Sequence, residues 1–168
     1  MRISMNMVKL IPVLLVAALT GCASVMSPQV LQQVDKDVTF EMMLEKPEAY
    51  AGKTLLLGGD IIEAQPFPKK TVITVLQRPL GLRDQPLSKN ESKGRFIAEV
   101  PGFLDPAIYR KGRQITVAGT FVAEEVRPLG KMKYTYPVIR CREIHLWPME
   151  GPLNRPRFYF GLGFSHGF

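Results

Sequence analysis

Histidine, cysteine and tryptophan are scarce in this chain of 168 residues, which contains two, two and one of them respectively. The sequence also has no HExxH, GxSxG, P-loop or CxxC motif, so the common signatures of metal, nucleophile and phosphate chemistry are absent. His145 lies among apolar residues and His166 lies in a glycine-rich tail, and neither position indicates a general base. We therefore expect no catalytic residues, no metal site and no cofactor.

A long apolar run is missing as well. The stretch Leu10–Leu19 carries no charge, but it is shorter than the ~20 residues that a membrane-spanning helix requires. It follows a start whose charges are Arg2 and Lys9. A basic start, a short apolar middle and small residues at the end are typical of a secretory signal, which we assign to residues 1–21.

The residues around the end of this leader, Leu19, Thr20, Gly21 and Cys22, resemble the lipobox of bacterial lipoproteins. The resemblance implies that the leader is cut before Cys22, that the Cys22 thiol receives diacylglycerol and that the new amino group is acylated. It also implies two partners, the membrane and the lipoprotein processing and sorting machinery. In enteric-type bacteria an aspartate after the lipidated cysteine tends to retain the protein in the inner membrane, so Ala23 favours the outer membrane. The alternative is an ordinary secreted protein whose cysteine falls here by chance.

The charge of the remaining 147 residues is modestly basic. The formal charge of +7 falls to +5 when the leader leaves, because two basic residues and no acidic ones go with it. The basic residues are spread along the chain, which indicates solvated turns and strand edges; contact with anionic lipid or lipopolysaccharide phosphates is the alternative. Nucleic acid is not an expected partner of an exported lipoprotein. With Cys22 acylated, Cys141 has no disulfide partner and is interpreted as a small buried residue, with a redox thiol as the alternative.

The mature chain is expected to begin with little structure. Residues 22–37 are polar, include Pro28 and show no period, so we interpret them as the lipidated N-terminus and a tether. A short helix is expected over Thr39–Leu44, because Thr39 suits the N-cap and Glu41 lies in the first turn. Residues 48–50 are able to add one more helical turn.

From Lys53 onward the sequence predicts β-structure, because segments rich in β-branched and aromatic residues alternate with glycine and proline. Gly58-Gly59 indicates a bulge or bend, Pro137 indicates an edge position or a break, and Asp105–Tyr109 predicts a single helical turn. The five expected strands cover Lys53–Glu63, Thr71–Gln77, Arg95–Val100, Gln114–Ala123 and Tyr134–Trp147.

These strands predict one domain over residues 38–148. Ile115, Val117 and Phe121 share one face of the clearest strand and are the predicted core residues. A mainly β chain with five strands and a helical turn before the fourth is typical of a small closed OB-like barrel. We expect five to six strands with one or two short helices, and a β-sandwich is the alternative.

Residues 149–168 form a tail rich in glycine and aromatic residues. Basic side chains beside aromatic ones suit a membrane interface. The candidates for contact with the membrane or with lipopolysaccharide are Arg155, Arg157, Phe158, Tyr159 and Phe160. Packing of these aromatic residues onto the barrel as an edge strand is the alternative.

Five short motifs occur in order behind the lipobox: Gln77–Leu80, Gly94–Phe96, Phe103–Tyr109, Tyr134–Pro137 and His145–Pro148. Together they resemble the Slp family, the starvation-inducible outer membrane lipoproteins of Gram-negative bacteria. The resemblance implies attachment to the outer membrane and expression in stationary phase or under stress, and it supplies no catalytic residues. We therefore expect a lipid-anchored binding or structural module of the envelope. An envelope enzyme with an unrecognised site and a small integral outer-membrane barrel are the alternatives.

Overall fold

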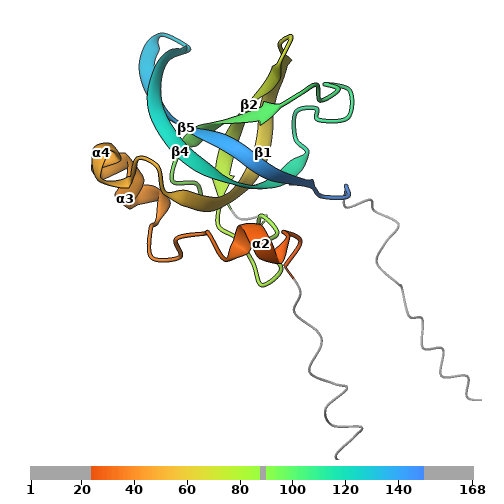
Figure 1. The fold of residues 1–168 in the computed structure, drawn as a ribbon. Helices are drawn as coiled ribbons and strands as arrows, with labels where there is room; N and C mark the ends of the chain where they lie inside the picture. Colours follow the sequence, from red (N-terminus) through yellow and green to blue (C-terminus); the bar gives the residue numbers. More distant parts are fainter. Residues whose placement is uncertain (1–23, 88–89, 150–168) are drawn as a thin grey trace, which may run out of the picture.

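The computed structural model describes residues 24–87 and 90–149, and Figure 1 shows the strands wrapped into one barrel with short helices beside it. The leader and the tail after Met149 lie outside the described residues. The helices are α2 (Pro28–Leu31), α3 (Phe40–Glu45) and α4 (Pro47–Tyr50). The strands are β1 (Thr54–Pro66), β2 (Lys70–Arg78), β3 (Arg95–Pro101), β4 (Gln114–Leu129) and β5 (Met132–Leu146).

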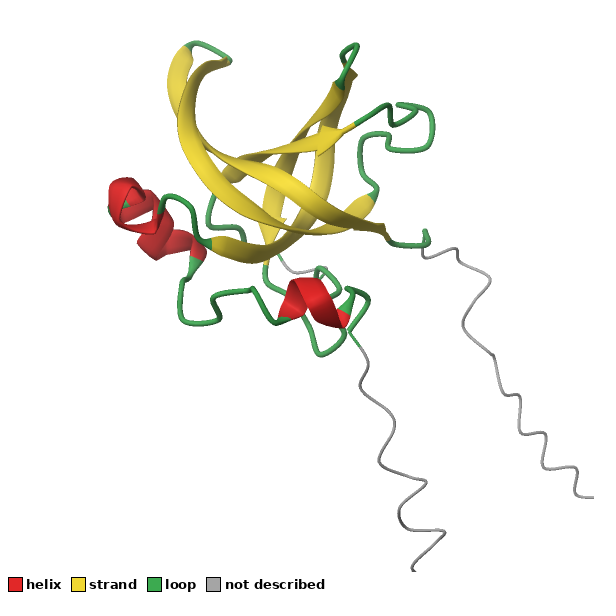
Figure 2. Ribbon diagram, viewed as in Figure 1, coloured by secondary structure: helices red, strands yellow, loops and turns green. Residues whose placement is uncertain are grey.

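The strands close into a barrel in the order β1-β2-β3-β5-β4, with β4 paired to β1 (Figure 2). All neighbouring strands are antiparallel except β3 and β5, which run parallel from Ile97 to Glu99. The small closed barrel predicted from the sequence is confirmed, and the described strands do not form a sandwich. Closure leaves no free edge along the body of the sheet.

Apolar side chains fill the barrel. The predicted core residues Ile115, Val117 and Phe121 are at most 1% exposed and pack in one cluster with Phe96. The opposite face of β4 is also buried, because Thr116 is covered: its hydroxyl donates to the Asp84 carbonyl at 2.6 Å and accepts from the Trp147 indole at 2.9 Å. The first half of β4 is therefore packed on both faces, whereas residues 123–126 are exposed.

The sequence predicted a bulge or a bend at the glycine pair in β1, and the bulge is wrong because the pair keeps its register. Gly58 and Gly59 pair with Arg78 and Gln77, and the register shifts farther along, between Ile61 and Glu63. A Cβ on Gly59 would lie 1.9 Å from the Leu76 carbonyl oxygen. Glycine is needed here for close approach of two strands, and not for an extra residue.

The segment predicted as a tether is packed onto the barrel from Ser24 onward. Met26 is 4% exposed, α2 follows it, and the Asp35 amide donates to the Thr54 carbonyl at 2.8 Å. Local polarity suggested a solvated linker, but the segment is held by contacts with residues far away in the sequence. The prediction of a tether is corrected for residues 24–37.

The short helical elements are partly as predicted. The Thr39 hydroxyl accepts from the Met42 amide at 3.2 Å and caps α3, which buries Phe40 and Met43. Asp105 caps one helical turn, as predicted: its carboxylate accepts from the Ala107 amide at 2.8 Å and its carbonyl accepts from the Tyr109 amide at 2.9 Å. The turn is not continued into a longer helix.

Replacing Val117 with alanine should lower the free energy of unfolding by about 1–3 kcal/mol, because the substitution removes buried methyl groups and leaves a cavity in the barrel. Urea denaturation followed by circular dichroism measures the change. Val126, on the same strand but 61% exposed, supplies the matched control, and Val126→Ala should leave stability nearly unchanged. Equal midpoints for Val117→Ala and the parent protein would contradict the strand register.

Candidate functional site

The reactive side chains of the described residues are dispersed or buried. No group of three or more histidine, cysteine, aspartate or glutamate side chains within residues 24–87 and 90–149 is arranged to hold a metal ion. Cys141 is 4% exposed, its thiol lies 3.1 Å from the Glu143 carbonyl, and burial raises its pKa to about 12. A thiol with this pKa stays protonated at neutral pH and is a poor nucleophile. Cys141 is a small buried residue, as predicted.

His145 is likewise a packing residue. Its ring meets the Trp147 ring edge to face, with the ring centroids 4.7 Å apart. It is half-buried on β5 and pairs with Thr116 of the neighbouring strand β4. We find no nucleophile bonded to it among the interactions that the structure describes.

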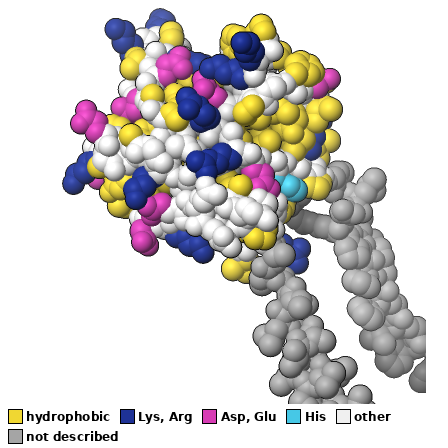
Figure 3. Space-filling model, viewed as in Figure 1, with side chains coloured by type: hydrophobic (Ala, Val, Ile, Leu, Met, Phe, Trp, Pro, Cys, Tyr) yellow, Lys and Arg dark blue, Asp and Glu magenta, His cyan; other side chains and the backbone are white. Residues whose placement is uncertain are grey.

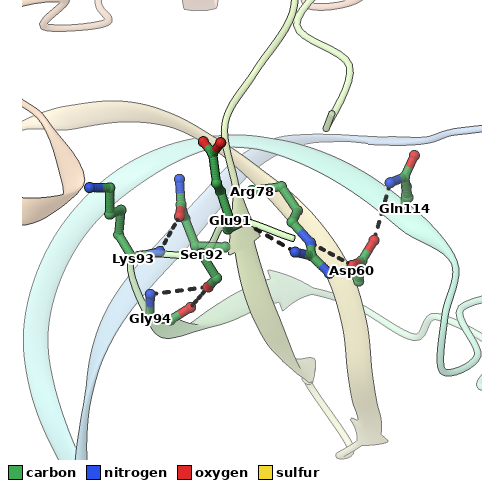
Figure 4. Close-up of polar contacts among 8 residues, drawn as sticks. Asp60, Arg78, Glu91, Ser92, Lys93, Gly94 and Gln114 are labelled. Atoms are coloured by element: carbon green, nitrogen blue, oxygen red, sulfur yellow. Dashed lines mark hydrogen bonds and ion pairs between the residues drawn. The ribbon is translucent and has the colours of Figure 1, made fainter. Parts of the chain in front are cut away.

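A polar network joins β1, β2 and β4 at one side of the barrel (Figure 4). The Asp60 carboxylate accepts from Arg78 Nε at 2.7 Å and from Gln114 Nε2 at 3.1 Å. Arg78 also donates to the Glu91 carbonyl at 3.1 Å, which ties the β2–β3 loop to the barrel. The Asp60 and Arg78 side chains are 23% and 18% exposed, so water screens the pair only in part.

Beside Asp60 lies an open groove of about 540 Å³, between β1, the start of β4 and the β3–β4 loop. Part of its lining is apolar, from Ile61, Ile62 and Leu76. Lys111 and Arg113 add cationic groups, and Arg113 is fixed by donating to the Trp147 carbonyl at 2.8 Å. The rest of the lining is Asp60, Gly112, Gln114, Pro148 and Met149. The groove therefore combines apolar walls with two positive charges.

The surface carries several large apolar side chains. Phe103 and Ile108 on the β3–β4 loop are 69% and 53% exposed, and Phe67 on the β1–β2 turn is 48% exposed. The two turns touch, since the Gly102 amide donates to the Lys69 carbonyl at 3.0 Å. Figure 3 shows hydrophobic side chains gathered on one side of the molecule, while lysine and arginine are scattered among acidic residues on the same face. The basic residues do not form one continuous patch on this face.

The N-terminal segment binds the barrel at a different place. The Ser27 amide and hydroxyl both donate to the Glu143 carboxylate, the hydroxyl at 2.7 Å, and the Ser24 hydroxyl donates to the Asp84 carboxylate. These contacts bring together residues separated by 116 and 60 positions in the chain. They hold the start of the described chain against β5 and the loop after β2.

The site residues predicted from the sequence fall outside the described residues. This holds for the lipobox, Leu19, Thr20, Gly21 and Cys22, and for the tail candidates Arg155, Arg157, Phe158, Tyr159 and Phe160. Sequence reasoning missed the groove and the Ser27–Glu143 contact. The only signal for the groove was Gly58-Gly59 beside Asp60, and nothing local pointed to Gln114, 54 positions away.

None of the helices in the described part of the chain is long and apolar enough to span a membrane. A family model described as "Outer membrane lipoprotein Slp family" matches residues 19–162. No solved structure matches the chain.

Three curated relatives are similar to this chain. "Outer membrane protein Slp" of Escherichia coli K12 is 27% identical over 150 residues, which cover 88% of this chain and 78% of the relative. "Uncharacterized lipoprotein YeaY" of the same organism is 27% identical over 75% of this chain and 68% of the relative. An uncharacterized protein of Haemophilus influenzae is 31% identical over 62% of this chain and 57% of the relative. The family match covers most of the chain and includes the whole barrel, and the chain therefore belongs to the Slp family of outer membrane lipoproteins.

Proposed function

We propose that this outer membrane lipoprotein is anchored through acyl chains on Cys22 and acts as a binding or structural module without catalysis. The observation that carries the proposal is the match of the Slp lipoprotein family model over residues 19–162, a stretch that begins at the lipobox. In the described chain, Ser24 lies two positions after Cys22 and is bound to the barrel through Asp84. The lipoprotein processing and sorting machinery is then the partner that cuts, acylates and delivers it.

The chemistry of the barrel supports a role without catalysis. Cys141 is buried with a raised pKa, and the Asp60 carboxylate is engaged by Arg78 and Gln114. In the described part of the chain, the other side chains with a shifted pKa belong to ion pairs near the surface. A hydrogen bond from Lys53, for example, lowers the pKa of Asp35. Side chains whose pKa is shifted by a surface ion pair have a structural role, whereas catalytic side chains with a shifted pKa cluster in a cleft.

The arrangement of polarity supports a lipid anchor over an integral barrel. Transmembrane barrels have eight or more strands, a polar interior and an apolar outer band. Here five strands enclose apolar residues such as Phe96 and Ile73, both 0% exposed. Charged pairs such as Lys70–Glu99 and Arg127–Glu125 lie on the outside.

The groove beside Asp60 is our candidate binding site. Lys111 and Arg113 suit a phosphate or carboxylate, and the partly exposed apolar side chains of Ile62 and Leu76 suit an acyl chain. An amphiphilic anion matches both parts of the lining. Such molecules surround an outer membrane lipoprotein as anionic lipids and lipopolysaccharide.

The resemblance to starvation-inducible lipoproteins also indicates in which growth phase the protein acts. We infer that the protein is needed in stationary phase or under stress, when the envelope is remodelled. Membership of the Slp family supports this inference.

Replacing Cys22 with serine should leave an unprocessed, unacylated precursor, because serine has no thiol to accept diacylglycerol. Intact-mass spectrometry of the protein from membranes should give a wild-type chain that begins at Cys22 and carries acyl chains. Cys141→Ser serves as the control and should leave processing unchanged. A mature wild-type N-terminus at any other residue would contradict the proposal.

Replacing Lys111 with glutamate should weaken binding of a short-chain phosphatidylglycerol by roughly fivefold or more, since each basic residue near an anionic headgroup contributes about 1 kcal/mol. Titration calorimetry with the protein produced without residues 1–22 measures the affinity, and short-chain phosphatidylcholine is the neutral ligand. Lys133→Glu, on an exposed residue of β5 outside the groove, is the matched control. Equal losses in both variants, or equal affinity for the two lipids, would refute the groove as the site.

The amount of protein per cell should rise on entry into stationary phase. Quantitative immunoblotting across a growth curve measures it, with a constitutive outer membrane protein as the reference. A constant ratio through starvation would contradict the stress-associated role.

A further inference from the structure

The loop that follows β2 displays one leucine at its tip. We call residues 79–87 the Leu82 loop. Leu82 is 91% exposed, while the backbone on either side is closed by hydrogen bonds from the Gly81 amide to the Gln85 carbonyl at 2.8 Å and from the Leu87 amide to the Pro79 carbonyl at 2.9 Å. A single exposed leucine is ordinary on a protein surface, so its meaning depends on what lies beside it.

The Leu82 loop is fastened to the barrel as well as to itself. The Asp84 carbonyl accepts from the buried Thr116 hydroxyl at 2.6 Å, and the Arg83 amide donates to Gln85 Oε1 at 2.9 Å. Asp84 adopts a left-handed backbone conformation, with φ of 61°, which turns the loop at this point. The position of Leu82 is therefore set by the fold.

The same loop holds the start of the described chain. The Ser24 hydroxyl donates to the Asp84 carboxylate, two residues from Leu82. Figure 1 shows α2 and the loop after β2 together at one end of the molecule, with the turns of the β1–β2 and β4–β5 hairpins at the far end. The described chain therefore starts, at Ser24, beside the Leu82 loop.

Chain length limits how far this end is from the bilayer. Ser24 lies two positions after Cys22, and an extended chain spans at most about 7 Å over two positions. The headgroup layer on each side of the hydrocarbon core is itself about 5–8 Å thick. If the acyl chains of Cys22 lie in the hydrocarbon core, Ser24 and the loop bound to it lie at the headgroups.

The charge at the tip of the loop fits an anionic surface. The Asp84 and Glu143 carboxylates are turned to Ser24 and Ser27, and Arg83 is exposed; Lys36 is exposed as well, beside the exposed Asp37. Basic residues are drawn to anionic headgroups, and an apolar side chain beside them is able to enter the interface. Leu82 and Arg83 supply this pair at the tip of the loop.

We propose that the Leu82 loop rests on the leaflet that holds the acyl chains of Cys22, with Leu82 inserted at the interface. The barrel then has one orientation on the membrane, and its β1–β2 and β4–β5 turns point away from that leaflet. This inference rests on the proposed anchoring through Cys22.

Depth-dependent fluorescence quenching tests the proposal on the full-length, processed lipoprotein. Leu82→Cys and, as the matched control, Met132→Cys are labelled with nitrobenzoxadiazole; Met132 is 57% exposed on the far β4–β5 turn. Cys141 is buried and leaves the introduced cysteine as the reactive thiol. The labelled proteins are reconstituted into phosphatidylethanolamine and phosphatidylglycerol vesicles with nitroxide spin labels near the headgroup.

The expected result is a shift to shorter emission wavelength and a loss of fluorescence at position 82, with neither change at position 132. Flotation and the mass of the mature N-terminus are measured on the same samples. An acylated, floating protein whose label at 82 stays aqueous overturns the orientation and leaves the anchor intact. A protein that neither floats nor carries acyl chains on Cys22 overturns both. Equal quenching at 82 and 132 also overturns the orientation.

Discussion

Pairing of β1 with β4 is the constraint on which the rest of the structure depends. It closes the barrel, with Leu57 opposite Val117 and Asp60 opposite Gln114. The first pair sits in the apolar core and the second lies at the edge of the groove. The same closure places Thr116 beneath the Leu82 loop, so the core, the groove and the anchoring end share one strand. Burial inside the barrel supplies the free energy that keeps these surface features in place.

The strands were predictable because their signals are local. β-Branched residues alternate along β2 and β4, and glycine or proline marks many of the ends, so the expected and observed bounds differ by a few residues at most in β2 and β3. The prediction made the β4–β5 hairpin too short, because it ended the first strand at Ala123 and began the second at Tyr134. Glu124, Glu125 and Arg127 resemble a loop in sequence, yet they pair with Pro137, Tyr136 and Tyr134 along an exposed extension of the sheet.

The candidate site was less predictable because its residues meet only after folding. Glu143 and Ser27 show no relation in sequence, and the polarity of residues 24–37 favoured a linker. The family could be recognised from short motifs in a fixed order, because such motifs are visible in the sequence without any knowledge of the structure. The lipobox is readable in the same way. The groove and the orientation of the Leu82 loop depend on three-dimensional contacts, which no local pattern encodes.

The parallel pairing of β3 with β5 has a consequence for the dynamics of the barrel. It runs only from Ile97 to Glu99 in the described chain, next to Pro137, which has no amide hydrogen to extend the ladder. The β4–β5 and β1–β4 ladders are far longer. Local opening begins where the hydrogen bonds between strands are fewest. The barrel should therefore open transiently between β3 and β5, while the amides of the other strands stay protected from hydrogen exchange. Amide hydrogen exchange in β5, compared between the amides that face β3 and those that face β4, therefore measures how often the barrel opens at this pairing.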